Sequence, residues 1–196
     1  ALGKHAESVL WVGGKGGMEA SLVSRYSLPY AEISAAGVHG VGAKALPGNL
    51  IKLMRGYFES KAILKNFKPD VVLFTGGYLA VPLAFAASKI KKLLYVPDIE
   101  PGLALKTLAA RADTITLTTE TSRGYFNPRK RMVVTGYPTR ADLETPNRES
   151  AAHQFYFDPK KPTLLVMGGS KGARSINNAL IQILPELLPA GGAVLV

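Results

Sequence analysis

The sequence predicts an α/β fold in which parallel strands form one Rossmann-like domain and begin a second. Three observations predict it: short apolar runs alternate with helical patterns, the runs are rich in Val, Leu, Ile and Thr, and glycine-rich segments follow several of them. We expect strands at 8–12, 71–74, 93–96, 114–118, 132–135, 163–167 and 193–196, and helices at 18–23, 49–67, 78–90, 102–110, 148–157 and 173–188. This alternation implies right-handed βαβ units, a doubly wound parallel sheet and strands buried on both faces.

A polar, proline-containing stretch predicts the domain boundary. We expect a first domain at residues 1–142, a linker at 143–162 and the start of a second domain at 163–196, where a strand is followed by a glycine loop and a helix. The chain starts in what resembles a helix end and stops in what resembles an unfinished strand, so we expect a fragment.

Composition excludes several classes of protein. With 47% hydrophobic and 19% charged residues, the chain is neither disordered nor fibrous. The absence of Cys excludes disulfides and thiolate metal sites, and three scattered His residues give no reason to expect a metal. No apolar run is long enough to span a membrane, and no signal peptide is recognisable. The net charge of +10 predicts an anionic partner: a phosphorylated ligand, an acidic membrane surface or nucleic acid.

The glycine segment 168–174 follows an expected strand and begins an expected helix. Glycines there let the backbone approach a ligand, and the N–H groups at the helix start favour phosphate. Ser170 adds a hydroxyl, and Lys171 and Arg174 add positive charge. The alternative is a tight turn in which the glycines serve packing only.

Three other strand ends carry glycines. Gly76, Gly77 and Tyr78 follow the strand 71–74, at the strand edge where open α/β sheets bind ligands. The segment 13–17 holds four glycines, for which we favour a structural or gating role over phosphate binding. Arg140 follows the strand 132–135, where its guanidinium could clamp a diphosphate, although the residue pattern alone favours a solvent-exposed arginine.

The helix expected at 49–67 is both basic and broadly apolar. Such a helix can lie on an anionic bilayer. Its pattern alone favours a core helix with a solvated basic edge.

Five segments occur together in one order: 17–19, 68–70 with 71–78, 136–140 and 168–174. Jointly they resemble the lipid II-forming N-acetylglucosaminyltransferases of bacterial peptidoglycan synthesis, which belong to glycosyltransferase family 28. The resemblance covers nearly the whole chain. It implies the two-domain GT-B architecture, with an N-terminal acceptor domain and a C-terminal domain for UDP-N-acetylglucosamine. It also implies inverting, metal-independent and cofactor-free transfer to the muramoyl C4 hydroxyl of lipid I, at the cytoplasmic face of the membrane.

The resemblance also assigns residues to roles. Gly76, Gly77 and Tyr78 would face the acceptor diphosphate. The donor-binding residues would be Arg140, Gly168, Gly169, Ser170 and Asn177. The membrane contact would be formed by Leu50, Lys52, Met54, Arg55 and Tyr57.

The sequence departs from the family pattern at two places. The family's Gly-Gly-Thr-Gly-Gly-His loop, whose His is a candidate base, would precede Ala1. Where the family has His-Glu-Gln-Asn, this chain has Tyr95-Val96-Pro97-Asp98, so Asp98 or Glu100 could serve as the base or contact the acceptor. Equally, both carboxylates could cap the helix that follows.

Two alternative functions stay open. The altered segment 95–98 suggests a GT-B transferase with another lipid or metabolite acceptor. A membrane-anchored acceptor platform for a separate catalytic subunit is the non-enzymatic alternative, and the donor-type loop at 168–174 argues against it. Nucleic-acid binding is not expected, because no recognised motif accompanies the dispersed basic residues.

Overall fold

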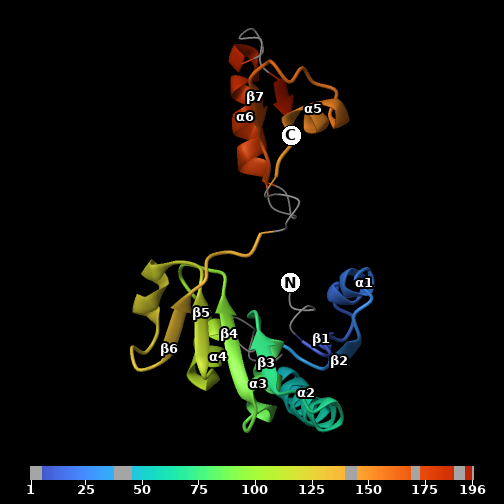
Figure 1. Cartoon of the computed structure of the whole chain (residues 1–196), viewed down its shortest axis with the longest axis vertical. Helices are drawn as coiled ribbons and strands as arrows, with labels where there is room; N and C mark the ends of the chain where they lie inside the picture. Colours follow the sequence, from blue (N-terminus) through green and yellow to red (C-terminus); the bar gives the residue numbers. More distant parts are fainter. Residues whose placement is uncertain (1–5, 38–45, 140–144, 169–172, 188–192, 196) are drawn as a thin grey trace. The chain divides into compact units, whose positions relative to one another are not determined.

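The computed structural model describes residues 6–37, 46–139, 145–168, 173–187 and 193–195. The chain divides into two compact units, residues 1–137 and 138–196 (Figure 1). The first unit ends at Tyr137, whereas the sequence predicted that the first domain ends at residue 142.

The first unit alternates strands and helices. In order, its elements are β1 (Trp11–Gly14), α1 (Glu19–Ser24), β2 (Tyr30–Ile33), α2 (Leu46–Phe67), β3 (Val71–Phe74), α3 (Ala80–Ala86), β4 (Lys91–Val96), α4 (Leu103–Arg111), β5 (Thr114–Leu117), the 3₁₀ helix η2 (Glu120–Tyr125) and β6 (Arg131–Val134). The second unit contains α5 (Arg148–Gln154), β7 (Thr163–Leu165), α6 (Arg174–Leu187) and β8 (Ala193–Leu195).

Every strand pair in the described structure is parallel, which confirms the predicted α/β class. β3, β4, β5 and β6 form one sheet in that order, β1 pairs with β2, and β7 pairs with β8. Because the strands of each sheet are parallel, their carboxyl ends lie on one edge, and the loops that follow β3 to β6 gather there.

The core of the first unit lies between the four-stranded sheet and the helices packed on it. It is formed mainly by alternate residues of β3 to β5 and by α3 and α4: Val72, Phe74, Leu83, Ala84, Leu94, Val96, Leu105, Leu108, Ile115 and Leu117. The intervening residues are less buried, and Val71 and Leu73 of β3 are exposed. The prediction of strands buried on both faces is therefore wrong for β3, as it is for β6, whose Val133 and Val134 are exposed.

Several element boundaries differ from the sequence prediction. β1 begins at Trp11 rather than residue 8, and neither β2 nor η2 was predicted. β2 is only four residues long and contains Glu32, so its apolar signal is weak. Helix α5 confirms the helix predicted at 148–157 but ends at Gln154, and the Asn147 side chain caps it by accepting a hydrogen bond from the Ser150 N–H.

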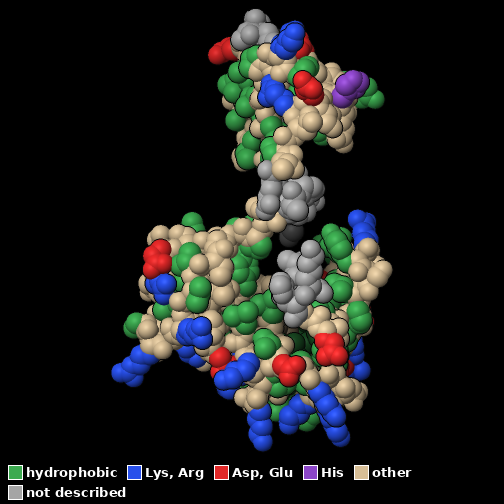
Figure 2. Space-filling view, viewed as in Figure 1, with side chains coloured by type: hydrophobic (Ala, Val, Ile, Leu, Met, Phe, Trp, Pro, Cys, Tyr) green, Lys and Arg blue, Asp and Glu red, His purple; other side chains and the backbone are tan. Residues whose placement is uncertain are grey.

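Charged side chains are unevenly spread over the first unit. Exposed cationic residues precede or begin its strands, including Lys68, Lys91, Arg129 and Arg131. Figure 2 shows Lys and Arg side chains gathered along the lower edge of this unit in the view.

Candidate functional site

The loops that follow β1, β2 and β3 lie against one another. An ideal Cβ placed on Gly14 would lie 3.5 Å from the Leu79 side chain, and one placed on Gly37 would lie 3.9 Å from Tyr78 Cδ1. The Lys15 N–H also donates to the Ile33 carbonyl over 3.2 Å, which joins the segment after β1 to the end of β2. The structure therefore brings the glycine segment 13–17 next to the predicted acceptor residues 76–78.

The loop after β3 has a backbone that only glycine adopts easily. Gly76 and Gly77 have φ angles of 115° and 78°. No heavy atom of the described structure lies within 4 Å of a Cβ built on Gly77, so this backbone faces open space, whereas Gly76 packs against Leu105. The Tyr78 side chain is exposed beside them. An open, glycine-rich backbone at the carboxyl end of a strand suits a ligand that must approach closely.

The two candidate carboxylates follow β4. Asp98 and Glu100 are both exposed, and neither carboxylate has a hydrogen-bond partner among the described residues. Only the Asp98 backbone is engaged, because its carbonyl accepts a hydrogen bond from the Ser122 hydroxyl over 3.4 Å. Helix α4 has Gly102 at its N-cap and no side-chain cap. The capping role that the sequence left open is therefore not observed, and both carboxylates are available to a ligand.

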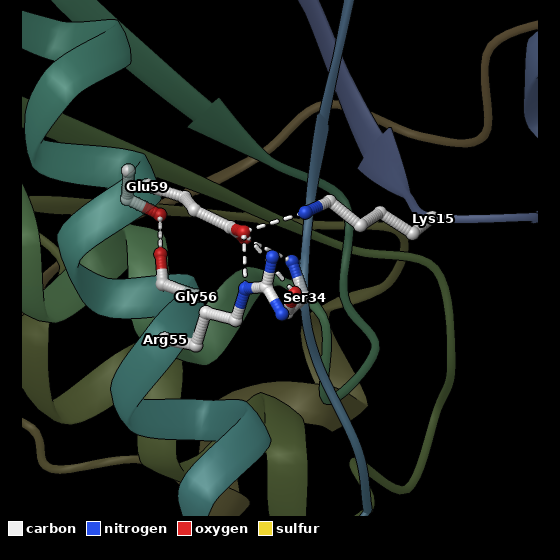
Figure 3. A network of polar contacts seen from close by, with 6 residues as sticks. Lys15, Ser34, Arg55, Gly56 and Glu59 are labelled. Atoms are coloured by element: carbon white, nitrogen blue, oxygen red, sulfur yellow. Dashed lines mark hydrogen bonds and ion pairs between the residues drawn. The ribbon is translucent and has the colours of Figure 1, made fainter.

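A polar network centred on Glu59 of α2 joins three segments at this edge (Figure 3). Glu59 Oε1 accepts from Lys15 Nζ at 2.6 Å and from Arg55 Nε at 3.1 Å. Its Oε2 accepts the Ser34 N–H at 2.5 Å. Desolvation alone would raise the pKa of Glu59, but the hydrogen bonds from Lys15 and Ser34 outweigh it and lower the pKa from 4.5 to about 2. Glu59 is therefore ionised at neutral pH.

Gly56 explains how α2 comes close enough to form this network. A Cβ on Gly56 would overlap the Ser34 carbonyl oxygen, so only glycine allows the helix to cross this backbone at the observed distance. The Ser60 hydroxyl donates to the Gly56 carbonyl over 2.6 Å inside the same crossing. The local sequence thus places Glu59 directly over Ser34.

The remaining face of α2 is apolar and open. Of the predicted membrane residues, Leu50, Lys52, Met54 and Arg55 are exposed, while Tyr57 is partly buried and packs edge to face on Phe58. Ile51 and Phe58, which were not singled out, are more exposed than Leu50 and Met54. Helix α2 also packs on the core of the first unit through Ile63 and Leu64, as the preference for a core helix predicts, whereas Leu50, Ile51, Met54 and Phe58 stay exposed. No helix in the described part of the chain is long and apolar enough to cross a membrane.

The predicted donor residues lie in or beside the second unit. Gly168 follows β7, and a Cβ there would overlap the Ala173 side chain, so a packing role for this glycine is observed. Asn177 is exposed on α6, with its backbone N–H bonded to the Ala173 carbonyl over 2.9 Å. Arg140, Gly169 and Ser170 lie outside the described residues.

A cavity of about 330 Å³ is lined by none of these residues. It is formed toward the amino ends of β5 and β6 by α4 and the segment after η2, and it is lined by Lys106, Ala109, Ala110, Ile115, Tyr125, Phe126, Asn127 and Lys130. No group of three or more His, Asp or Glu residues that could hold a metal ion occurs among the described residues.

Sequence reasoning missed the Glu59 network. The signal was present, because Glu59 is the sole acidic residue of α2 and follows Arg55 by four positions among several lysines. The partners Lys15 and Ser34 could not be found this way, since they come from distant segments and β2 was not predicted.

Comparisons with known proteins agree with the fold. Residues 1–119 match the glycosyltransferase family 28 N-terminal domain. A Roseiflexus protein named UDP-N-acetylglucosamine–N-acetylmuramyl-(pentapeptide) pyrophosphoryl-undecaprenol N-acetylglucosamine transferase is 38% identical over 96% of this chain and 48% of its own length. A Halalkalibacterium halodurans protein of the same name is 34% identical over 91% of this chain and 50% of its own length. The chain spans about half the length of the curated relatives it matches.

The fold also resembles a solved structure. The crystal structure of Acinetobacter baumannii MurG matches 95% of this chain and 48% of its own chain, with a TM-score of 0.66 and 23% identity. At this identity the likeness concerns the fold.

Proposed function

The chain belongs to glycosyltransferase family 28, and on that premise we propose that the complete protein transfers N-acetylglucosamine from UDP-N-acetylglucosamine to lipid I. The attacking group is the C4 hydroxyl of the muramoyl residue, transfer inverts the anomeric centre, and the product is lipid II. The observation that carries this proposal is the 38% and 34% identity, over nearly the whole chain, to transferases whose names contain both the donor sugar and the undecaprenol-linked acceptor.

In this proposal the first unit holds the acceptor. The diphosphate of lipid I lies against Gly76, Gly77 and Tyr78. The open backbone at Gly77 supports this, since N–H groups at close range can donate to phosphate oxygens without a side chain in the way.

A general base must remove the proton of the attacking hydroxyl. Within the described chain the candidates are Asp98 and Glu100, whose exposed carboxylates follow β4 without structural partners. The family's histidine-bearing loop is the other candidate, and it would precede Ala1.

The donor is held by the second unit and the segment that leads to it. Arg140, Gly168, Gly169, Ser170 and Asn177 contact UDP-N-acetylglucosamine in this proposal. The leaving UDP gains negative charge as the glycosidic bond breaks, and a guanidinium together with backbone N–H groups would stabilise that charge.

We place the enzyme at the cytoplasmic face of the membrane, attached peripherally through α2. The support is the exposed row of Leu50, Ile51, Met54 and Phe58, flanked by exposed Lys and Arg side chains on the same helix. Such a combination suits insertion of apolar side chains beside anionic headgroups.

A transfer assay tests the function. The complete protein is incubated with labelled UDP-N-acetylglucosamine and lipid I, and the lipid product is separated and counted. We expect label in lipid II. Transfer to a different lipid but not to lipid I would show that lipid I is not the acceptor. The altered segment 95–98 would then explain the different specificity. Absence of any transfer, with retained lipid binding, would favour an acceptor platform.

A further inference from the structure

We propose that Lys15 and Arg55, held side by side by Glu59, form a phosphate-binding contact for the diphosphate of the lipid-linked acceptor. The contact lies between the glycine segment after β1 and the exposed face of α2. This inference rests on the proposed function and adds two cationic residues to its acceptor site.

The geometry places two cations around a single oxygen atom. Lys15 Nζ and Arg55 Nε both bind Glu59 Oε1, so the ammonium and the guanidinium are neighbours although the two residues are 40 positions apart in the sequence. The three side chains together carry a charge of +1 at neutral pH. Two adjacent cations match a ligand with two adjacent phosphates.

Both cations keep donors for a ligand. The side chains of Lys15 and Arg55 are 46% and 70% exposed, whereas that of Glu59 is 22% exposed. An ammonium has three N–H donors and a guanidinium has five, so the bonds to Glu59 leave several in each group. The carboxylate is the inner member of the cluster and the cations are its outer members.

The surroundings suit the charged part of a lipid. Lys15 lies in the segment that packs against the loop 76–79, and the backbone at Gly16, beside it, has no neighbour within 4 Å of a built Cβ. Arg55 lies on α2 among the exposed side chains of Met54 and Phe58. A prenyl diphosphate joins a doubly phosphorylated head to an apolar tail, and here the cations lie where an apolar helix face meets a glycine-lined edge.

Glu59 acts as a positioning residue in this arrangement. Its carboxylate is fixed by the Ser34 N–H, and it holds the flexible Lys15 side chain in one place. Lys side chains lose substantial rotamer freedom when they bind, so a lysine that is already held loses less of it on binding phosphate.

The test measures binding of geranyl diphosphate, a soluble prenyl diphosphate, to the complete protein by calorimetry. We expect Lys15→Met to weaken binding about tenfold, the loss typical of one charge-assisted hydrogen bond. We expect Glu59→Gln to weaken it about threefold by releasing Lys15. If Glu59 acted only through its negative charge, its removal would tighten phosphate binding, so tighter binding overturns the positioning role.

A matched control separates this effect from general damage to surface ion pairs. Glu120 and Arg123 form an exposed ion pair on η2, remote in sequence from the cluster, and Glu120→Gln should leave the affinity unchanged. Unchanged affinity in Lys15→Met, with the thermal stability of the variant intact, overturns the proposal.

Membrane phospholipids offer the same phosphate chemistry, so a second arm uses vesicles that contain phosphatidylglycerol. We expect Lys15→Met to sediment with them as the unchanged protein does. Loss of vesicle binding with retained geranyl diphosphate affinity would assign the contact to lipid headgroups instead and overturn the proposal. Neither arm needs catalysis, so failure of sugar transfer would count against the proposed function while these affinities still test the contact.

Discussion

Two charged clusters of the first unit, at opposite ends of its strands, use the same chemistry in different ways. At the amino ends of β4 and β5, the buried ammonium of Lys92 donates to the carbonyls of Ala87 and Ile90, at 3.3 and 2.7 Å, and pairs with Asp113 at 3.3 Å. The Lys92 N–H also donates to Asp113 over 2.8 Å. At the carboxyl ends of β1 and β2, Glu59 is the inner group and its cations face solvent.

The difference indicates which cluster maintains the fold and which can bind a ligand. Around Lys92 the charge is inside and its donors point to fixed protein acceptors, which is how a buried charge is tolerated. Around Glu59 the partly buried group is an acceptor, and Lys15 and Arg55 keep exposed donors. We therefore expect Lys92 to control stability and the Glu59 cluster to control both stability and ligand affinity.

The largest expected effect is on stability at the amino ends of the strands. Lys92→Met removes the buried ammonium, so the Ala87 and Ile90 carbonyls and Asp113 lose its hydrogen bonds, and Asp113 keeps the bond from the backbone N–H of residue 92. We expect the free energy of unfolding to fall by about 3 kcal/mol, measured by equilibrium chemical denaturation. Lys91→Met changes an exposed neighbour and should lower the free energy of unfolding only slightly. A loss below about 0.5 kcal/mol for Lys92→Met would show that this cluster does not support the fold.

The next effect concerns the close crossing that builds the Glu59 cluster. In Gly56→Ala the new methyl group overlaps the Ser34 carbonyl, so the helix must move away, and we expect a loss of about 2 kcal/mol. Gly48→Ala is the control within the same helix, because no described atom lies within 4 Å of a Cβ built there. This substitution should raise the free energy of unfolding by up to about 1 kcal/mol. Equal effects of the two substitutions would contradict the crossing.

Acid should weaken both clusters, and the Glu59 contribution can be isolated. The folded-state pKa of Glu59 lies near 2, below its ordinary 4.5, so its stabilisation is complete above about pH 5 and is lost as pH falls from 4.5 toward 2. The hydrogen bond from the Lys92 N–H lowers the pKa of Asp113 too, against the opposing effect of burial, so its contribution has the same sign.

Allowing for the solvent exposure of Lys15 and Arg55, we expect Glu59 to contribute about 1 to 2 kcal/mol. The free energy of unfolding, measured by chemical denaturation at several pH values from 6 to 3, should therefore decrease less steeply with falling pH for Glu59→Gln than for the unchanged protein. The same dependence on pH in both proteins would mean that the Glu59 carboxylate does not form the described contacts with Lys15, Ser34 and Arg55.

The smallest expected effect comes from the exposed pair on η2. Glu120→Gln breaks the ion pair with Arg123, which lies near the surface, and should change stability by less than about 0.5 kcal/mol. The Arg123 side chain also donates to the Met132 carbonyl over 3.3 Å, and this contact is untouched. If Glu120→Gln lowered the free energy of unfolding as much as Lys92→Met does, burial would not determine how much a charged cluster contributes to stability.

The sequence predicted the strands and helices that carry strong patterns and the glycine loops between them. Val71–Phe74 and Thr114–Leu117 are apolar runs bounded by polar residues, and both are strands close to the expected limits. β2 was missed because four residues that include Glu32 produce no apolar run. Short strands of this kind are defined by their neighbours, here β1 through parallel pairing, more than by local sequence.

Candidate site residues could be proposed where they belong to a local motif, and they were missed where they depend on tertiary contacts. Gly76 and Gly77 could be singled out because they follow a predicted strand, and the structure gives both of them positive φ angles. The Glu59 cluster required the crossing of α2 over Ser34, which no local pattern encodes. The extent of the exposed face of α2 could not be predicted either, since a wide apolar arc does not reveal which part of it the core covers.

The most direct test of the account is to locate the acceptor on the protein. A lipid I analogue with a photoreactive group beside the diphosphate is bound to the complete protein, irradiated, and mapped by mass spectrometry. The account predicts labelled peptides that contain residues 15–17 and 76–78, at the carboxyl ends of β1 and β3. Labelling confined to the cavity lined by Lys106, Tyr125 and Lys130, toward the amino ends of β5 and β6, would contradict it.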